Sequence, residues 1–254
     1  MGETPTRIDA TRTSLRIVQL IRDKDGARAA ALVDELDVSK STVHAHLTTL
    51  QECGYVTKQG EIYRLGLHLF HLGQHARIRD RRYRLARDKT VEVAESLHYA
   101  IDFDVETNGR MISLFHQADP STEIGFEPGA YFHMHASGTG KATLALLPDE
   151  RVDAIIERWD MPAKTDETIT EPSVLRADIR RTRDRGYGLV DEEWLDGHRA
   201  VGVAVRLPDG RPFGALSAGG PKYRLTDETI RSEVAPALQD AAGALEEAID
   251  ETYR

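Results

Sequence analysis

The chain has 254 residues, of which 40% are hydrophobic, with a formal net charge of -9 and one cysteine. This composition is typical of a globular protein of about two domains. It excludes an internal disulfide, and no apolar run reaches the roughly 18 residues that cross a membrane. Because the N-terminus also lacks the pattern of a signal peptide, we expect a cytoplasmic protein in which Cys53 is a small core residue.

Charge is distributed unevenly along the chain. Residues 1–87 contain 15 Lys and Arg against 10 Asp and Glu, a net charge of +5. Residues 88–254 contain 18 against 32, a net charge of -14. A basic segment joined to an acidic one is typical of a nucleic-acid-binding module attached to a partner domain that phosphate repels.

Residues 29–56 predict a helix-turn-helix. Two apolar stripes at spacings of three and four residues indicate two short helices, formed by Ala29, Leu32, Val33 and Leu36, then by Val43, Leu47 and Leu50. Ser39 is placed to cap the second helix, Val38 and Val43 to staple its start, and Gly54 to end it in a left-handed conformation. Taken alone, the pattern also fits an ordinary helical hairpin with a solvated polar face.

The neighbouring segments favour the DNA-binding interpretation. A helix is predicted over residues 12–23, before the pair. Two strand-like runs, residues 55–57 and 61–65, flank a tight turn that contains Gly60. Three helices followed by a small hairpin predict a winged helix-turn-helix over residues 1–66.

A linker helix follows at residues 67–82, with Leu67, Leu69, Phe70 and Leu72 as candidate interface residues. Six arginines fall between residues 77 and 87. This basic run suits either DNA phosphate or an acidic partner surface, and the sequence leaves both open.

Residues 83–254 predict a second domain in which helices and strands alternate. Asn108-Gly109 is a strong hairpin signal between strands at 101–106 and 111–116. Further strands are expected at 189–191, 200–207 and 211–219. Helices are expected at 83–99, 138–147, 149–159, 172–185 and 227–251. A mostly antiparallel sheet with flanking helices makes the fold class α+β.

Several separated motifs resemble the IclR-type transcriptional regulators. In the first domain they are SLRIVQL (14–20), VSKSTVHAHLTTLQECGYV (38–56) and YRLG (63–66). In the second they are HASGTGKA (135–142), RGYGLVDEE (185–193) and GHRAVGVAVRLPDGRPFGALSAGGP (197–221). The resemblance implies a transcription factor that binds palindromic double-stranded DNA as a homodimer or dimer of dimers. It also implies that residues 83–254 form a GAF-like effector-binding domain.

Short hydroxyls and imidazoles on the second helix of the pair suit close approach to base edges and phosphates. Together with the resemblance they identify the DNA-binding candidates, which are Arg16, Ser39, Lys40, Ser41, Thr42, His44, Ala45, His46, Lys58 and Gln59. The family commonly has arginine where this chain has Ala45, so one contact is expected to be missing.

The resemblance also places an effector pocket between the sheet and the helix at 138–147. Its expected lining is Ile124, Phe132, Ser137, Gly138, Thr139, Val190, Asp191, His198, Ala200, Ser217 and Gly219. A small carboxylate at the helix start is the first expectation, with a sugar or sugar acid next. The alternative is that these glycines only permit close helix–sheet packing. Family members often carry polar residues at the positions of Val190, Ala200 and Gly219, so we expect a less polar pocket.

Signals for catalysis are weak. His133 and His135 lack a third metal ligand at a suitable spacing, residues 138–143 lack the spacing of a phosphate loop, and no nucleophile elbow is present. We expect no metal, cofactor or catalytic residue. The other hypotheses are an enzyme built on the GAF-like domain, and a regulator that senses protein contacts.

Overall fold

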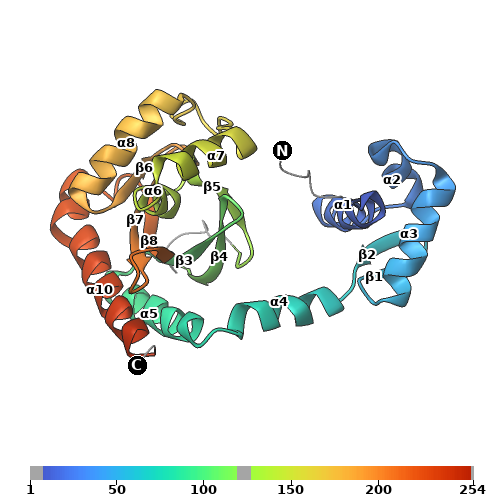
Figure 1. Cartoon of the computed structure of the whole chain (residues 1–254), viewed down its shortest axis with the longest axis horizontal. Coiled ribbons are helices and arrows are strands. Elements are labelled where there is room, and N and C mark those ends of the chain that lie inside the picture. The colour runs from blue at the N-terminus through green and yellow to red at the C-terminus, as the bar shows by residue number, and fades with distance from the viewer. Residues whose placement is uncertain (1–7, 119–126, 253–254) are drawn as a thin grey trace, which may run out of the picture. The chain divides into compact units, whose positions relative to one another are not determined.

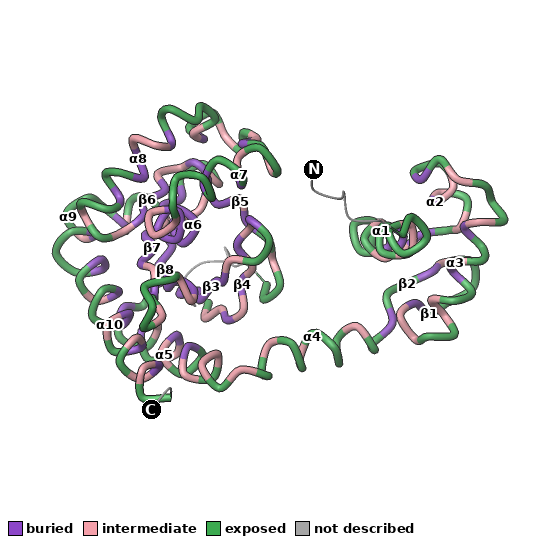
Figure 2. Tube along the Cα trace, viewed as in Figure 1, coloured by how far each residue is buried: buried purple, intermediate pink, exposed green. Residues whose placement is uncertain are grey.

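The computed structural model describes residues 8–118 and 127–252, and the chain divides into two compact units, residues 1–79 and 80–254 (Figure 1). Each unit has its own buried core (Figure 2). Among the described residues, no helix is long and apolar enough to cross a membrane.

The first unit is a winged helix-turn-helix followed by a further helix. Its elements are α1 (Asp9–Asp23), α2 (Ala29–Leu36), α3 (Lys40–Glu52), β1 (Val56–Gln59), β2 (Ile62–Leu65) and α4 (His68–Ile78). Ile17, Leu32, Val43 and Leu47 are fully buried between the first three helices. Backbone hydrogen bonds join Ala27 to Tyr63 in both directions, at 3.0 and 2.8 Å, and fasten the wing to the start of α2.

The predicted ends of α3 are confirmed. The Ser39 hydroxyl accepts a hydrogen bond from the Thr42 amide at 3.1 Å, and Gly54 has a φ of +77°. Cys53, however, is exposed, so its assignment to the core was wrong. The reason is that Cys53 is the C-cap of α3 and lies beyond the last residue of the buried stripe.

The wing differs in detail from the prediction. β1 continues through Lys58 and Gln59, and Gln59 pairs with Ile62. The turn is therefore Gly60-Glu61, with Gly60 at a φ of +60°, a left-handed value that glycine adopts without strain.

The second unit contains a six-stranded antiparallel sheet in the order β5-β4-β3-β8-β7-β6. The strands are β3 (Ala100–Thr107), β4 (Arg110–Gln117), β5 (Tyr131–His133), β6 (Gly188–Asp191), β7 (His198–Arg206) and β8 (Pro212–Pro221). The helices are α5 (Arg81–Leu97), α6 (Gly138–Leu144), α7 (Asp149–Trp159), α8 (Pro172–Arg185), α9 (Asp227–Thr229) and α10 (Ala235–Glu251). This arrangement confirms the predicted α+β class.

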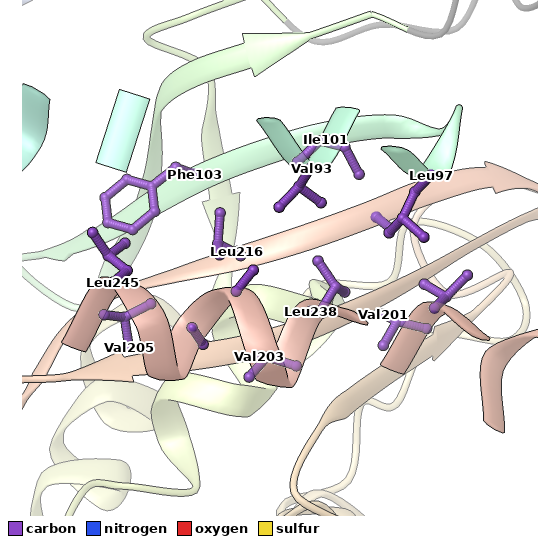
Figure 3. Packing of buried hydrophobic residues seen from close by; sticks show 14 of the residues in the cluster. Val93, Leu97, Ile101, Phe103, Val201, Val203, Val205, Leu216, Leu238 and Leu245 are labelled. Atoms are coloured by element: carbon purple, nitrogen blue, oxygen red, sulfur yellow. The ribbon is translucent and has the colours of Figure 1, made fainter. Parts of the chain in front are cut away.

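The two faces of the sheet bury different sets of side chains. On one face α5 and α10 cover Ile101, Phe103 and the valines of β7 (Figure 3). α6 packs on the opposite face, where a second cluster includes Met111, Met134 and Leu175. Because side chains alternate along a strand, Asp102 and Asp104 of β3 point to the α6 side of the sheet.

Candidate functional site

The α3 face carries the DNA-binding candidates of the first unit. Lys40, Ser41, His44 and Ala45 are exposed, whereas His46 is half-buried. The ring Nδ1 of His46 lies 2.8 Å from the hydroxyl of Ser14 on α1. His46 therefore takes part in helix packing, which leaves His44 as the more accessible imidazole.

The hydroxyls at the start of α3 bond to one another. The Ser39 hydroxyl lies 2.8 Å from the hydroxyls of both Ser41 and Thr42. These groups define the helix start, and a contact with DNA would have to compete with the bonds between them. On α1, Arg16 is exposed, with its guanidinium 3.5 Å from the Glu35 carbonyl oxygen.

On the wing, Lys58 and Gln59 are exposed at the end of β1. The Lys58 ammonium lies 3.8 Å from the Glu61 carboxylate and 5.2 Å from the centre of the Tyr63 ring. Such an exposed pair is weak, so the Lys58 cation remains available to a phosphate.

A cavity lies between α6 and strands β3, β6, β7 and β8 of the second unit. Its interior volume is about 50 Å³, and the total is about 580 Å³ when the open space at its mouth is counted. The structure brings nine of the expected pocket residues to its wall: Phe132, Ser137, Gly138, Thr139, Val190, His198, Ala200, Ser217 and Gly219. Ile124 lies outside the described residues.

Asp191 does not line the cavity. Its carboxylate contacts the Arg199 guanidinium at 2.8 Å and the Lys222 ammonium at 3.1 Å. Neighbouring residues on a strand point to opposite faces, so Val190 and Asp191 cannot both face the cavity. Arg199, paired with Asp191 across the two strands, points away from the cavity for the same reason.

Sequence reasoning missed six lining residues, which are Ala100, Asp102, Asp104, His116, Ala136 and Trp194. A signal for two of them was present. In the β3 sequence, Asp102 and Asp104 alternate with Ile101, Phe103 and Val105, as polar residues would on the second face of a strand buried on both sides.

The acidic wall of the cavity consists of Asp102, Asp104 and His116. The His116 Nδ1 lies 2.8 Å from Asp102, and this hydrogen bond raises the pKa of His116. Burial and the neighbouring Asp102 raise the pKa of Asp104 to about 8. The Thr139 hydroxyl donates to Asp104 Oδ2 at 2.6 Å, while Asp104 Oδ1 is buried with no hydrogen-bond partner among the described residues.

His198 forms the wall opposite the acids. Burial lowers its pKa, so its imidazole is neutral near pH 7. A Cβ at position 219 would lie 3.1 Å from the ring carbon Cε1 of His198. Gly219 therefore leaves room for this ring, which would have to shift slightly if this position carried a side chain.

The glycines near α6 serve close packing as well as lining the cavity. A Cβ at Gly202 would lie 2.2 Å from the carbonyl carbon of Gly138, and one at Gly188 would lie 2.3 Å from its oxygen. The glycines near α6 therefore do both of the things considered for them: they line the cavity and they permit close packing of the helix on the sheet. The Ser137 hydroxyl already accepts the Gly140 amide at 3.1 Å, so α6 does not offer all its amides to a ligand.

A buried ion triad fastens the cavity wall to α8. The Lys141 ammonium, on α6, lies 2.8 Å from Asp178 of α8 and 2.6 Å from Glu193. Glu193 precedes Trp194, which lines the cavity. The rings of Trp194 and Phe132 pack edge to face, with their centres 5.1 Å apart. Lys141 therefore binds protein carboxylates, and residues 138–143 do not form a phosphate loop.

His133 and His135 lie close together, with ring centres 5.4 Å apart. Within residues 8–118 and 127–252, no cluster of three His, Cys, Asp or Glu side chains could hold a metal ion.

Comparison with known families decides what kind of protein this is. The family model for the C-terminal domain of the bacterial transcriptional regulator IclR matches residues 82–247, and the IclR helix-turn-helix domain matches residues 13–60. The chain belongs to the IclR family of transcriptional regulators. This membership confirms the family resemblance and identifies the chain as a regulator rather than an enzyme.

Individual relatives agree with this assignment. The chain is 29% identical over 247 residues to the "Probable HTH-type transcriptional regulator ArcR" of Halobacterium salinarum, covering 95% of this chain and 94% of the relative. An IclR regulator from Alicyclobacillus acidocaldarius has the same fold at 19% identity, with a TM-score of 0.82 and coverage of 96% and 100%. The inducer-binding domain of PobR from Acinetobacter, solved with 3-hydroxybenzoic acid, has a TM-score of 0.59 at 22% identity, covering 64% of this chain and 96% of that one.

Proposed function

We propose that this regulator controls a catabolic operon in response to a small metabolite that binds in the cavity beside α6. Its α3 helix and wing would bind a palindromic operator, and α4 would hold two subunits together. IclR family members bind DNA through their helix-turn-helix domain and sense small-molecule effectors. The proposal adds two points: the effector binds in the cavity beside α6, and the regulated genes form a catabolic operon.

The observation that carries the proposal is the cavity itself. Nine expected residues from distant parts of the sequence converge on one cavity that opens to solvent. Cavities of this kind, with apolar walls and a few polar groups, are where proteins bind small ligands. In the related PobR domain, the bound molecule is a small hydroxylated aromatic acid.

Organic acids, sugars and sugar acids are the ligand classes expected from the sequence. The described wall has two carboxyl groups and two imidazoles, but no lysine or arginine. A ligand that presents only a carboxylate would lie close to the carboxyl groups of Asp102 and Asp104 without a lysine or arginine to bind it. The cavity therefore favours a ligand that donates hydrogen bonds, as sugar hydroxyls do.

The test combines ligand binding with DNA binding. Metabolites that raise the thermal stability of the protein are added to a complex with its operator, and fluorescence anisotropy measures the change in DNA affinity. Ala200→Leu, which fills part of the cavity, should abolish the response but preserve DNA binding. Gly138→Leu is unsuitable because its side chain would meet the β7 backbone.

Ala204→Leu is the matched control, since it makes the same change on the same strand at a residue that does not line the cavity. It should respond like the wild type. DNA affinity that no cavity-binding metabolite changes would refute effector control at this site and favour a regulator that senses protein contacts.

A further inference from the structure

Asp104 lies in the cavity wall as a carboxyl group without a full set of partners. We propose that the cavity recognises a protonated nitrogen, as in an ammonium, amidinium or guanidinium group, and that Asp104 is the carboxylate that receives it. This inference rests on the proposed function, because it names the chemistry of the effector that the same cavity would bind.

The described wall of the cavity offers a simple anion no lysine or arginine. Among the described lining residues the ionisable groups are Asp102, Asp104, His116 and His198. An anionic head group would find no lysine or arginine among these residues, whereas a cationic one could lie beside Asp104 and stabilise its ionised form.

The two acids differ in what they already bind. Asp102 already has a partner in His116, which lies within hydrogen-bond distance and whose pKa it raises. Asp104 receives one hydrogen bond, from Thr139 to Oδ2, and is only 3% exposed. Within the described part of the chain its other oxygen, Oδ1, accepts no hydrogen bond of normal length, although the buried Ser113 hydroxyl on the neighbouring strand interacts with this carboxyl and lowers its pKa. A buried acceptor of this kind is costly to leave empty, so a donor on the ligand would be favoured.

Release of a proton from Asp104 on binding distinguishes a cationic ligand from a neutral ligand that donates hydrogen bonds. Burial and Asp102 raise the pKa of Asp104 to about 8, so in the empty cavity this carboxyl carries a proton near pH 7. A bound cation stabilises the ionised form, and the proton leaves Asp104 for the solvent as the ligand binds. A sugar or other neutral ligand would release no proton.

The aromatic walls suit the same ligand. Phe132 and Trp194 line the cavity, and the faces of aromatic rings attract cations. A cationic ligand would therefore meet aromatic rings as well as a carboxylate.

Benzamidinium, benzamide and benzoate test the inference because they share one ring and differ in head-group charge. Isothermal calorimetry at pH 7 with the full chain should give at least tenfold tighter binding for benzamidinium than for either of the others. Titrations in buffers of different ionisation enthalpy should show the release of close to one proton with benzamidinium and none with benzamide.

Asp104→Asn should weaken benzamidinium binding at least tenfold and abolish the proton release. The amide is close in shape to the protonated carboxyl and can still accept the Thr139 hydrogen bond, so the variant is expected to fold. Asp184→Asn, on the exposed side of α8, makes the same change outside the cavity and should behave like the wild type.

Tighter binding of benzoate, absence of proton release, or no binding of benzamidinium would each overturn the inference. These measurements involve no DNA. A preference for benzoate would therefore refute the cationic ligand while leaving effector control of DNA binding intact, and the operator experiment would test that control separately.

Discussion

At the residue scale, the most unusual group is Lys141, a lysine that is 1% exposed between two acids. Burial opposes ionisation of Asp178, but attraction by Lys141 and Arg185 outweighs it and lowers the pKa of that carboxyl. For Glu193 burial prevails over Lys141 and raises the pKa. The same lysine therefore stabilises one carboxylate fully and the other only in part.

Replacing this lysine should destabilise the second unit severely. Lys141→Met leaves the buried Glu193 without its cation and Asp178 with only its longer contacts to Arg181 and Arg185, and breaking a buried pair typically costs about 3–5 kcal/mol. Urea unfolding followed by tryptophan fluorescence measures it, since both tryptophans, Trp159 and Trp194, belong to this unit. Lys89→Met, which breaks a more exposed pair with Glu92, should cost less than about 1 kcal/mol. Equal losses in the two variants would contradict the buried triad.

Asp104 should make stability depend on pH. The unfolded chain loses this proton near the ordinary aspartate pKa of 3.8, while the folded chain keeps it up to a pKa of about 8. Between these two pKa values the folded state therefore binds more protons than the unfolded state. The contribution of Asp104 to the free energy of unfolding falls as pH rises through that window, by at most about 1.4 kcal/mol per pH unit. Asp104→Asn should flatten this decline between pH 5 and 8, as urea unfolding at a series of pH values would measure. A profile identical to that of Asp184→Asn would be evidence against the raised pKa.

At the element scale, α3 has two kinds of polar residue. Lys40 and His44 are exposed and bear no side-chain hydrogen bond within the described structure, whereas Ser39, Ser41 and Thr42 bond to one another at the helix start. His46 bonds to α1. The helix thus uses part of its polar surface to hold its own position, and we expect DNA contacts to concentrate on the remainder.

Three substitutions on α3 should separate these roles. Lys40→Ala should weaken binding to every sequence and reduce the salt dependence by roughly one phosphate contact. His44→Ala should alter base preference by about 1–3 kcal/mol at one position. His46→Ala should mainly loosen α3 against α1, at a cost of about 0.5–1.5 kcal/mol, visible as faster hydrogen exchange. Gel shifts on an operator series measure the first two effects. Wild-type behaviour in both would show that another surface reads the DNA.

At the scale of the whole molecule, α4 is the element whose apolar side chains stay exposed in the single chain. None of its residues is buried, and Leu67, Phe70 and Ile78 are 84%, 65% and 50% exposed from its N-cap to its last residue. An apolar helix face of this kind is typical of an interface between subunits. A dimer would also explain how such a short recognition helix could read a palindrome.

Phe70→Asp should therefore weaken self-association at least tenfold, because a carboxylate would be buried in the interface. Sedimentation equilibrium measures the change, and operator binding should become weaker in parallel. His75→Asp places a carboxylate at an exposed polar position of the same helix and serves as the control. A wild-type protein that stayed monomeric with and without DNA would refute dimerisation altogether.

The local architecture was determined by the sequence alone. Apolar residues at helical spacing, the Ser39 cap and Gly54 define the helix pair, and Asn108-Gly109 defines the β3–β4 hairpin. These features depend on residues close together in the chain, whose geometry follows from backbone and capping preferences. The family motifs also predicted most of the residues that line the cavity.

Only the tertiary structure decided how the polar residues are used. Strand register turned Asp191 toward Arg199 and brought Asp102, Asp104 and His116 into the cavity. Sequence spacing could not show that Lys141 meets Asp178 and Glu193, because the three lie on separate segments that only the packed sheet brings together. The charge of the cavity, and with it the class of ligand it favours, thus depends on long-range packing and not on any single motif.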